Sequence, residues 1–350
     1  MKRLLALLAA LCLLLGTASA NSFTYTQESV TDCANTSFKY NAFYDAGELS
    51  ALVPGLKQSI VPQGVSYLAE KNWAIIAGYS SEDKTNSVLF AVDLATGEMV
   101  RETKLQYADG SVYAGHAGGV AVTEKNIFIS NNAHLYRISL EKYLALSDSD
   151  YCAFDEEIPV PSRSSYCAYA DGVLWVGEFQ YSTSYKTDSS HWYKNEDGRY
   201  KAWLIGYELD AAQPGELKAS AFGGETATPD YIISTTERIQ GMTVCDNQFF
   251  LSQSYGRRNY SVLLRYQNVL ESDPRETVEL NGTQVPLWCL NSTVQAGQLV
   301  MPPMSECLAT IDGSIYVLFE SGAKTYMDPA NPSVNPVDRL FRLTNVNAGN

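Results

Sequence analysis

A short strand-like motif that occurs five times constrains the fold of this chain more than any other feature. Each copy is a run of six residues with Leu in third place and apolar or aromatic residues around it. The copies lie at residues 87–92, 133–138, 202–207, 261–266 and 338–343. A unit that recurs in this way indicates a repeat architecture, in which neighbouring units bury each other's apolar faces.

Two further strand-like runs precede every copy of the motif, and short turns join them. Asp171-Gly172 and Asp312-Gly313 are turns of the kind that close β-hairpins. A fourth run is visible in places, at 99–105 and 231–234. The first run of each set is rich in small residues, as expected for strands crowded around a central axis. Four antiparallel strands per unit, repeated radially, predict an all-β fold of the β-propeller type.

The number of motif copies predicts five blades. Six blades would result if the N-terminal segment formed most of a blade by itself. The last unit lacks a clear fourth strand, whereas the segment 22–43 contains strand-like runs at 22–25 and 37–43. Because ring closure removes exposed strand edges, we predict that this N-terminal segment supplies the outer strand of the final blade.

The first twenty residues have the features of a secretory signal peptide. Lys2 and Arg3 precede an apolar run over 4–15, and a group of small residues ends at Ala20. We therefore expect cleavage near Ala20, a single propeller domain over 21–350, and a location outside the cell or in the periplasm. No later run approaches the ~20 apolar residues that a transmembrane helix needs, so no transmembrane segment is expected.

The net charge of the chain narrows the choice of partners. The chain has 39 acidic and 25 basic side chains and a net charge of −14, without a basic run. This balance disfavours nucleic acid as a partner, because phosphate contacts need clustered Lys and Arg.

Six cysteines follow the signal segment. They either form up to three disulfides or serve as small buried apolar residues.

Three glutamates are the candidate catalytic residues. Glu178, Glu306 and Glu320 each lie within or beside an apolar run, where a carboxylate needs a partner. On one interpretation two of them form a pair for general acid–base chemistry. On the other they are structural groups that accept hydrogen bonds from backbone N–H groups or pair with arginines.

His116 is a further catalytic candidate, because it lies in the glycine-rich run 115–119 and the chain has only three histidines. The alternative is that it caps a tight turn between blades. Asn131 and Asn132, together with Glu178, offer oxygen ligands for a metal ion, and calcium is the candidate ion. The sequence identifies no other cofactor.

The candidate ligand-binding residues are polar or aromatic and lie at the starts of first strands or the ends of second strands. They are Gln63, Gln240, Tyr79, Ser254, Tyr255 and Arg257. Gln63-Gly64 and Gln240-Gly241 match each other in sequence. A glutamine amide can donate and accept at a channel mouth, or it can form a structural hydrogen bond from one blade to the next.

These two Gln-Gly-apolar starts, within a five-unit secreted chain, resemble the plant-type glutaminyl cyclotransferases. The chain also resembles an uncharacterised group of secreted bacterial β-propellers. The other three blades start differently, with Gly118-Gly119, Tyr166-Cys167 and Ser305-Glu306. The resemblance implies a secreted propeller and adds cyclotransferase chemistry to the activities considered.

Three functions follow from these patterns. The first is a secreted protein that binds a small molecule, a carbohydrate or a peptide at the channel mouth, beside the Tyr-rich insertion at 181–200. The second is an enzyme with paired glutamates, either glycosidase-like or glutaminyl-cyclotransferase-like. The third is a scaffold for protein–protein interaction. The Tyr-rich rims favour the first, because aromatic loops on a rigid frame suit ligand binding without requiring catalysis.

Overall fold

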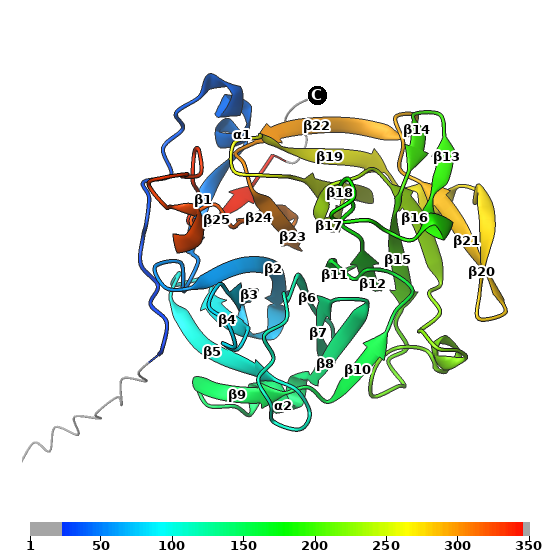
Figure 1. Ribbon diagram of the computed structural model, residues 1–350, viewed down its shortest axis with the longest axis horizontal. Helices are drawn as coiled ribbons and strands as arrows, with labels where there is room; N and C mark the ends of the chain where they lie inside the picture. Colours follow the sequence, from blue (N-terminus) through cyan, green and yellow to red (C-terminus); the bar gives the residue numbers. More distant parts are fainter. Residues whose placement is uncertain (1–22, 346–350) are drawn as a thin grey trace, which may run out of the picture.

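The computed structural model describes residues 23–345, so the predicted signal peptide at 1–20 lies outside the described residues. Five twisted sheets surround a common axis, as Figure 1 shows, and a small two-stranded sheet lies outside them. The chain is therefore an all-β propeller with five blades, as the repeats predict. No helix within 23–345 is long and apolar enough to cross a membrane.

Every blade has four core strands, which follow one another from the axis outward. Blade 1 contains β2 (Ile60–Leu68), β3 (Trp73–Ser80), β4 (Val88–Asp93) and β5 (Met99–Gln106). Blade 2 contains β6 (Gly119–Val122), β7 (Asn126–Asn131), β8 (His134–Ser139) and β10 (Glu156–Pro159). Blade 3 contains β11 (Tyr166–Ala170), β12 (Val173–Gly177), β15 (Ala202–Glu208) and β16 (Tyr231–Thr235). Blade 4 contains β17 (Ile239–Cys245), β18 (Gln248–Gln253), β19 (Ser261–Gln267) and β22 (Gln295–Met301). Blade 5 contains β23 (Ser305–Ile311), β24 (Ser314–Phe319), β25 (Arg339–Leu343) and β1 (Gly47–Leu52).

The five copies of the motif form the third strand of the five blades, namely β4, β8, β15, β19 and β25. The small residues of the first strands allow these strands to approach one another closely at the axis. A Cβ atom on Gly64 would lie 2.5 Å from the backbone nitrogen of Val120 in the next blade. One on Gly241 would lie 2.5 Å from the Cα atom of Cys307. Glycine is therefore required where inner strands of neighbouring blades meet.

The N-terminal part of the chain closes the ring, but with a different segment from the one predicted. The closing strand is β1, in which Gly47 pairs with Leu343 of β25 in antiparallel register. Residues 38–45 are helical instead of extended, with a 3-10 turn over Phe38–Tyr40 followed by α1 (Asn41–Asp45). The physical reason is packing: fully buried Phe43 stacks on Phe341 at 4.0 Å between ring centroids. This contact covers the end of blade 5 before the strand begins.

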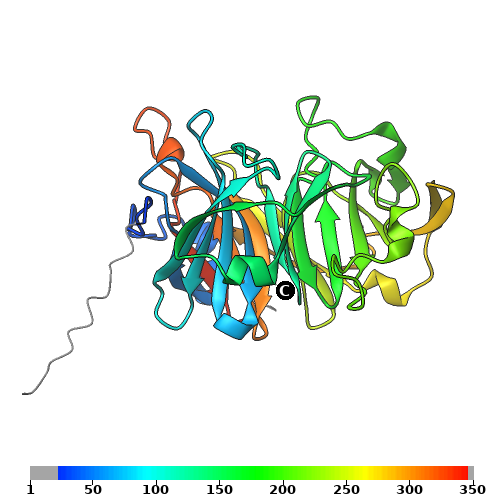
Figure 2. The ribbon, with the colours of Figure 1, turned by 90° about the horizontal axis from the view of Figure 1, so that it is seen from below.

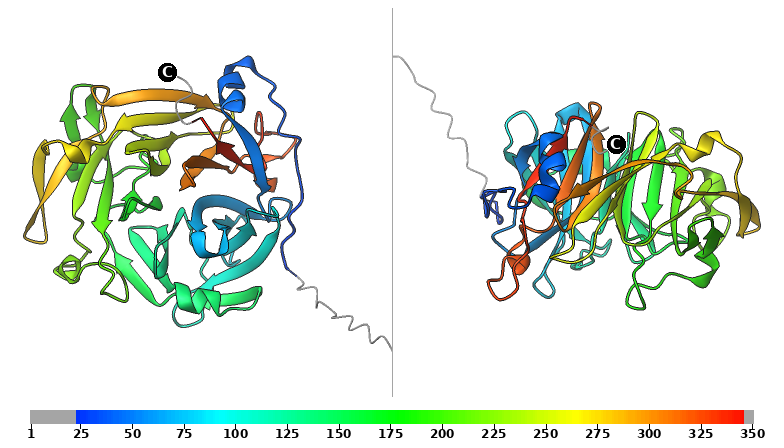
Figure 3. Two further views of the ribbon diagram at one scale, coloured as in Figure 1. Left: turned by 180° about the vertical axis from the view of Figure 1, so that it is seen from behind. Right: turned by 90° about the horizontal axis from the view of Figure 1, so that it is seen from above.

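Several strands lie outside the four-strand pattern, and the repeats did not predict them. β9 (Ser149–Ala153) adds to blade 1 parallel to β5, after the short helix α2 (Leu140–Leu144). The hairpin of β20 (Glu276–Leu280) and β21 (Thr283–Cys289) adds to blade 3 parallel to β16 and projects from the rim in Figure 3. A small hairpin of β13 (Tyr193–Asn195) and β14 (Gly198–Tyr200) lies within the long insertion. Parallel additions join segments distant in sequence, so no local pattern reveals them.

The apolar core consists of five layers, one between each pair of neighbouring blades. The layer between blades 5 and 1 includes Tyr25 from the N-terminal segment, which extends the closure beyond β1. None of the six cysteines within 23–345 forms a disulfide, and all six are buried. They serve as small buried residues, the second of the two roles that the sequence allowed.

Candidate functional site at the channel mouth

One face of the propeller carries a cavity of about 710 Å³ at the mouth of the central channel. It is lined by the starts of innermost strands and the ends of second strands, so both predicted sets of residues share one face. The loops around residues 181–192 (green) and 321–337 (orange-red) rise on the same side of the disc in Figure 2. The cavity has the size of a site for a small ligand, typically ~300–1,000 Å³.

Most of the predicted site residues line this cavity. They are Gln63, Tyr79, His116, Asn131, Asn132, Gln240, Ser254, Tyr255, Arg257, Glu306 and Glu320. Glu178 is absent from the lining. The five blades therefore bring together, at one mouth, side chains that lie more than 250 positions apart in the sequence.

Glu306 and Glu320 form a carboxyl pair at this mouth. Ser305 pairs with Phe319; Glu306 follows Ser305 within β23, at a local irregularity of the ladder, and Glu320 directly follows the end of β24. The Glu306 carboxyl donates a hydrogen bond to Glu320. Burial, followed by the charge of Glu320, raises the pKa of Glu306 well above its usual value. Burial also raises the pKa of Glu320 to about 7, although this side chain is only partly buried and keeps contact with water in the cavity. The pair therefore holds at least one proton near neutral pH.

The two matching glutamines hold this pair from the neighbouring blades. Gln63 of blade 1 donates its side-chain N–H to Glu320 over 3.0 Å and to the carbonyl oxygen of Pro62 over 2.9 Å. Gln240 of blade 4 donates to Glu306 over 3.2 Å. Because both amide nitrogens face the carboxyl pair, both amide oxygens point away from it and act as acceptors.

Tyr326 connects the carboxyl pair to a second group of side chains. Its hydroxyl donates to Glu320 and is in hydrogen-bonding contact with the hydroxyl of Tyr79. Burial raises the pKa of Tyr79 to about 12 and that of Tyr326 further, so both remain neutral donors. The Arg257 guanidinium lies 4.8 Å from the centre of the Tyr326 ring. Its positive charge lowers the pKa of Glu320 and so partly offsets the effect of burial.

His116 stacks on Tyr79 with 4.5 Å between ring centroids. Its backbone N–H donates to the side-chain oxygen of Asn131 over 3.2 Å. Burial by the surrounding walls lowers the pKa of His116 to about 4, although the residue remains exposed to the cavity, which weakens this effect. The imidazole is therefore neutral at neutral pH and offers one donor and one acceptor.

Aromatic side chains from blades 3 and 4 form the opposite part of the rim. This aromatic wall consists of Phe179, Tyr181, Tyr185 and Tyr255. Tyr181 packs on Tyr255 at 4.0 Å between ring centroids, and Phe179 meets Tyr185 edge-on at 5.1 Å. Tyr185 and Tyr255 are 46% and 37% exposed, so their rings are accessible to a ligand. The Tyr-rich insertion at 181–200 thus contributes to the mouth.

The cavity lining also includes residues that sequence reasoning missed, among them Arg163, Phe179 and Tyr326. Phe179 directly follows the candidate Glu178, so its position at a strand end was a usable signal. Tyr326 lies in the loop between β24 and β25, and Arg163 lies between blades 2 and 3. Nothing in their local sequence indicates where these loops fold back.

Glu178 is fully buried beside the cavity, and its carboxylate accepts three hydrogen bonds. The donors are the backbone N–H groups of Arg163 and Trp203, each over 2.9 Å, and the ring nitrogen Nδ1 of His191 over 3.0 Å. Asn131 and Asn132 line the cavity, whereas Glu178 does not. Within residues 23–345, no three His, Cys, Asp or Glu side chains come together in a way that could hold a metal ion.

No protein-family model matches the sequence. No curated protein matches it. Similar solved structures include hydrazine synthase of Kuenenia stuttgartiensis (10% identity, 73% of this chain, 55% of that chain, TM-score 0.35). They also include glutaminyl cyclase of Myxococcus xanthus (9% identity, 81% and 90% covered, TM-score 0.39) and a GH43_1 enzyme of Xanthomonas citri (9% identity, 87% and 92% covered, TM-score 0.42). The chain spans about half the length of the hydrazine synthase chain. We therefore infer function from the residues of this chain alone.

Proposed function

We propose that the channel mouth binds a small polar molecule, a sugar or a peptide. Hydrogen-bond donors of the ligand meet Glu306 and Glu320, and its body lies against the aromatic wall. The observation that carries this proposal is the placement of a carboxyl pair, with Glu306 buried and Glu320 partly buried, and an aromatic wall around one cavity of about 710 Å³. Hydrogen bonds to a charged acceptor are about twice as strong as neutral ones, and aromatic faces add contact area.

The floor of the site favours donors over acceptors in the ligand. The carboxyl pair presents acceptor oxygens, and the amide oxygens of Gln63 and Gln240 face away from that pair. Hydroxyl groups of a sugar and N–H groups of a peptide both satisfy such a floor. An anionic group would instead be repelled by the carboxyl pair, and Arg257 and Arg163, which line the cavity, would partly offset this repulsion.

Calorimetric titration with two probes, cellotriose and trialanine, tests the proposal. We expect at least one probe to bind the native protein and its affinity to fall about tenfold in Glu306→Gln and in Tyr255→Ala. Glu157→Gln, on the exposed outer strand β10, is the matched control and should leave binding unchanged. Failure of both probes to bind, or equal affinities in the native protein and Glu306→Gln, would contradict the proposal.

A second candidate function is general acid–base catalysis by the same pair. It is favoured by the pKa of Glu320 at about 7, because such a group both accepts and returns protons at neutral pH. The two carboxyl groups hydrogen-bond to each other, whereas glycosidase pairs stand ~5 Å or more apart. This contact favours proton transfer at one ligand atom over glycosidic cleavage. Mass spectrometry of the probes after incubation tests it, with Glu320→Gln as the variant expected to abolish any product.

A further inference from the structure

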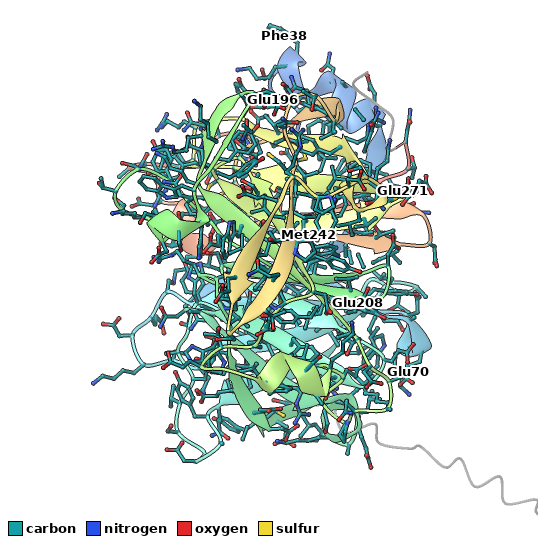
Figure 4. All side chains as sticks on the ribbon, turned by 90° about the vertical axis from the view of Figure 1, so that its right-hand side faces the viewer. Phe38, Glu70, Glu196, Glu208, Met242 and Glu271 are labelled. Atoms are coloured by element: carbon teal, nitrogen blue, oxygen red, sulfur yellow. The ribbon has the colours of Figure 1, made fainter. Side chains whose placement is uncertain are left out.

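The long insertion of blade 3 contacts the propeller at its outer end and at its inner end. At its outer end, Glu196 and Asp197 in the turn of the β13–β14 hairpin contact neighbouring elements. Arg275 forms an ion pair of 2.7 Å with Glu196, and Ser292 donates its backbone N–H to Asp197 over 2.7 Å. Glu196 is labelled in Figure 4, near the outer surface beside the strands of blade 4. This contact lies away from the channel mouth.

At its inner end, the insertion is fastened by His191. The Nδ1 atom of this ring lies 3.0 and 3.1 Å from the two carboxylate oxygens of Glu178. The ring also stacks on Trp203, with 3.7 Å between centroids and 14° between planes. Glu178 is fully buried, and the side chain of His191 is 11% exposed. The pair thus joins the insertion to the end of β12 and the start of β15.

The same carboxylate contacts segments that carry residues lining the mouth. Phe179, the residue after Glu178, belongs to the aromatic wall. Arg163 donates its backbone N–H to Glu178, and its guanidinium donates to the carbonyl oxygen of Lys186 over 3.0 Å. Lys186 directly follows Tyr185, whose ring lines the cavity. Three segments that meet at Glu178 therefore each carry or hold a cavity-lining side chain.

We propose that Glu178 and His191 are a positioning pair that holds the aromatic wall in the geometry needed for ligand binding. Neither residue lines the cavity, so the pair acts through Phe179, Arg163 and Tyr185. This inference rests on the proposed binding function of the mouth. Two backbone N–H groups hold the carboxylate in place, and His191 is the side chain of the insertion that binds it.

Hydrogen exchange monitored by mass spectrometry tests the pair without any ligand. His191→Phe keeps an aromatic ring over Trp203 but removes the donor to Glu178. We expect exchange of amides in 181–192 to accelerate about tenfold, because the buried carboxylate loses a hydrogen-bond partner. His191→Asn places an amide nitrogen near the former Nδ1 position and should restore slow exchange. Glu196→Gln weakens the outer contact and should affect only 193–200.

A purely structural role would give a different pattern. Exchange would then accelerate throughout blade 3, including β11 and β12, and His191→Asn would not restore it. Either result would overturn the inference, as would unchanged exchange in His191→Phe.

Calorimetry with cellotriose and trialanine then separates this inference from the proposed function. We expect His191→Phe to lower the affinity for the probe about tenfold. His191→Asn and Glu196→Gln should bind the probe with the affinity of the native protein. Faster exchange with unchanged probe affinity would overturn the positioning role while leaving the binding function intact. If neither probe binds the native protein, the proposed function fails, and the exchange pattern alone decides whether the pair orders the insertion.

Discussion

Gln63 donates a hydrogen bond of 3.0 Å to Glu320 across the boundary between the first and the last blade. Gln240 repeats this arrangement with Glu306 across the boundary between blades 4 and 5. The matching Gln-Gly starts therefore serve two purposes at once. Each glycine allows inner strands to approach, and each glutamine fixes one carboxyl group of the pair at the channel mouth.

Replacement of Gln63 by Met should destabilise the protein in a pH-dependent manner. The substitution retains side-chain volume but removes one donor to Glu320 and the side-chain donor to the carbonyl oxygen of Pro62. We expect a loss of about 1–3 kcal/mol in the free energy of unfolding, larger at about pH 8 than at about pH 5 because the charged carboxylate needs the donor more. Urea unfolding measures it, with Gln298→Met on the exposed side of β22 as the control. Equal losses at both pH values would contradict the assigned contact.

The carboxyl pair should make the native protein less stable as the pH rises from about 4.5 to about 7. Since the pKa of Glu320 and that of Glu306 are raised on folding, the native state binds more protons than the unfolded chain in this window. The contribution of the pair to the free energy of unfolding is therefore fully present at low pH and is lost as the pH rises, by about 2 kcal/mol for Glu320. In Glu306→Gln, which lacks the second titrating carboxyl group, urea unfolding should show a shallower decline. Parallel curves for the native protein and this variant would rule out the coupling.

The glycine of the second Gln-Gly start should not tolerate a side chain. A Cβ at residue 241 would lie 2.5 Å from the Cα atom of Cys307 and 3.0 Å from the carbonyl oxygen of Glu306. We expect Gly241→Ala to lower the free energy of unfolding by about 2–4 kcal/mol, because backbone atoms would have to move. Gly223→Ala, where only one atom lies within 4 Å at 3.9 Å, is the control. Thermal unfolding compares the two, and similar midpoints would show that the inner strands are not crowded at this point.

Asp338 should be essential for attachment of the N-terminal segment. Its buried carboxylate accepts from the backbone N–H groups of Val30 and Thr31 over 2.8 and 3.2 Å, and from the Ser29 hydroxyl over 2.9 Å. Asp338→Ala should therefore destabilise the protein by about 3 kcal/mol. Limited proteolysis should then cut first within residues 24–46. Asp328→Ala, at an exposed turn, should behave like the native protein, and resistance of Asp338→Ala to cleavage would show that β1 alone secures the ring.

The sequence predicted the architecture because each blade repeats a local pattern. Three strands joined by short turns recur five times, and Leu89 or Leu204 marks the same strand in each unit. Closure by the N-terminal part was predictable from the missing fourth strand. The prediction assigned closure to the wrong segment because the run at 37–43 has strand-like composition. In the structure this run is helical, and Phe43 stacks on Phe341.

The mouth was predictable in composition but not in its contacts. Strand ends indicated Gln63, Gln240, Glu306 and Glu320, yet nothing in their local sequence shows which amide meets which carboxyl group. Those contacts depend on the order of blades around the ring. Glu178 has the same local pattern as Glu306 but faces a different set of donors, because the insertion brings His191 onto it. The contacts of Glu178 and Glu306 therefore differ because of how a distant loop folds, which the local sequence does not show.

Carbon-13 nuclear magnetic resonance of labelled glutamate carboxyl groups would decide whether Glu306 and Glu320 share a proton. Their resonances are assigned from Glu306→Gln and Glu320→Gln, and both are followed from acidic to alkaline pH. We predict that one carboxyl titrates near pH 7 while the other remains protonated to higher pH. Two independent titrations near the ordinary value of 4.5 would show that the mouth holds no proton-sharing pair.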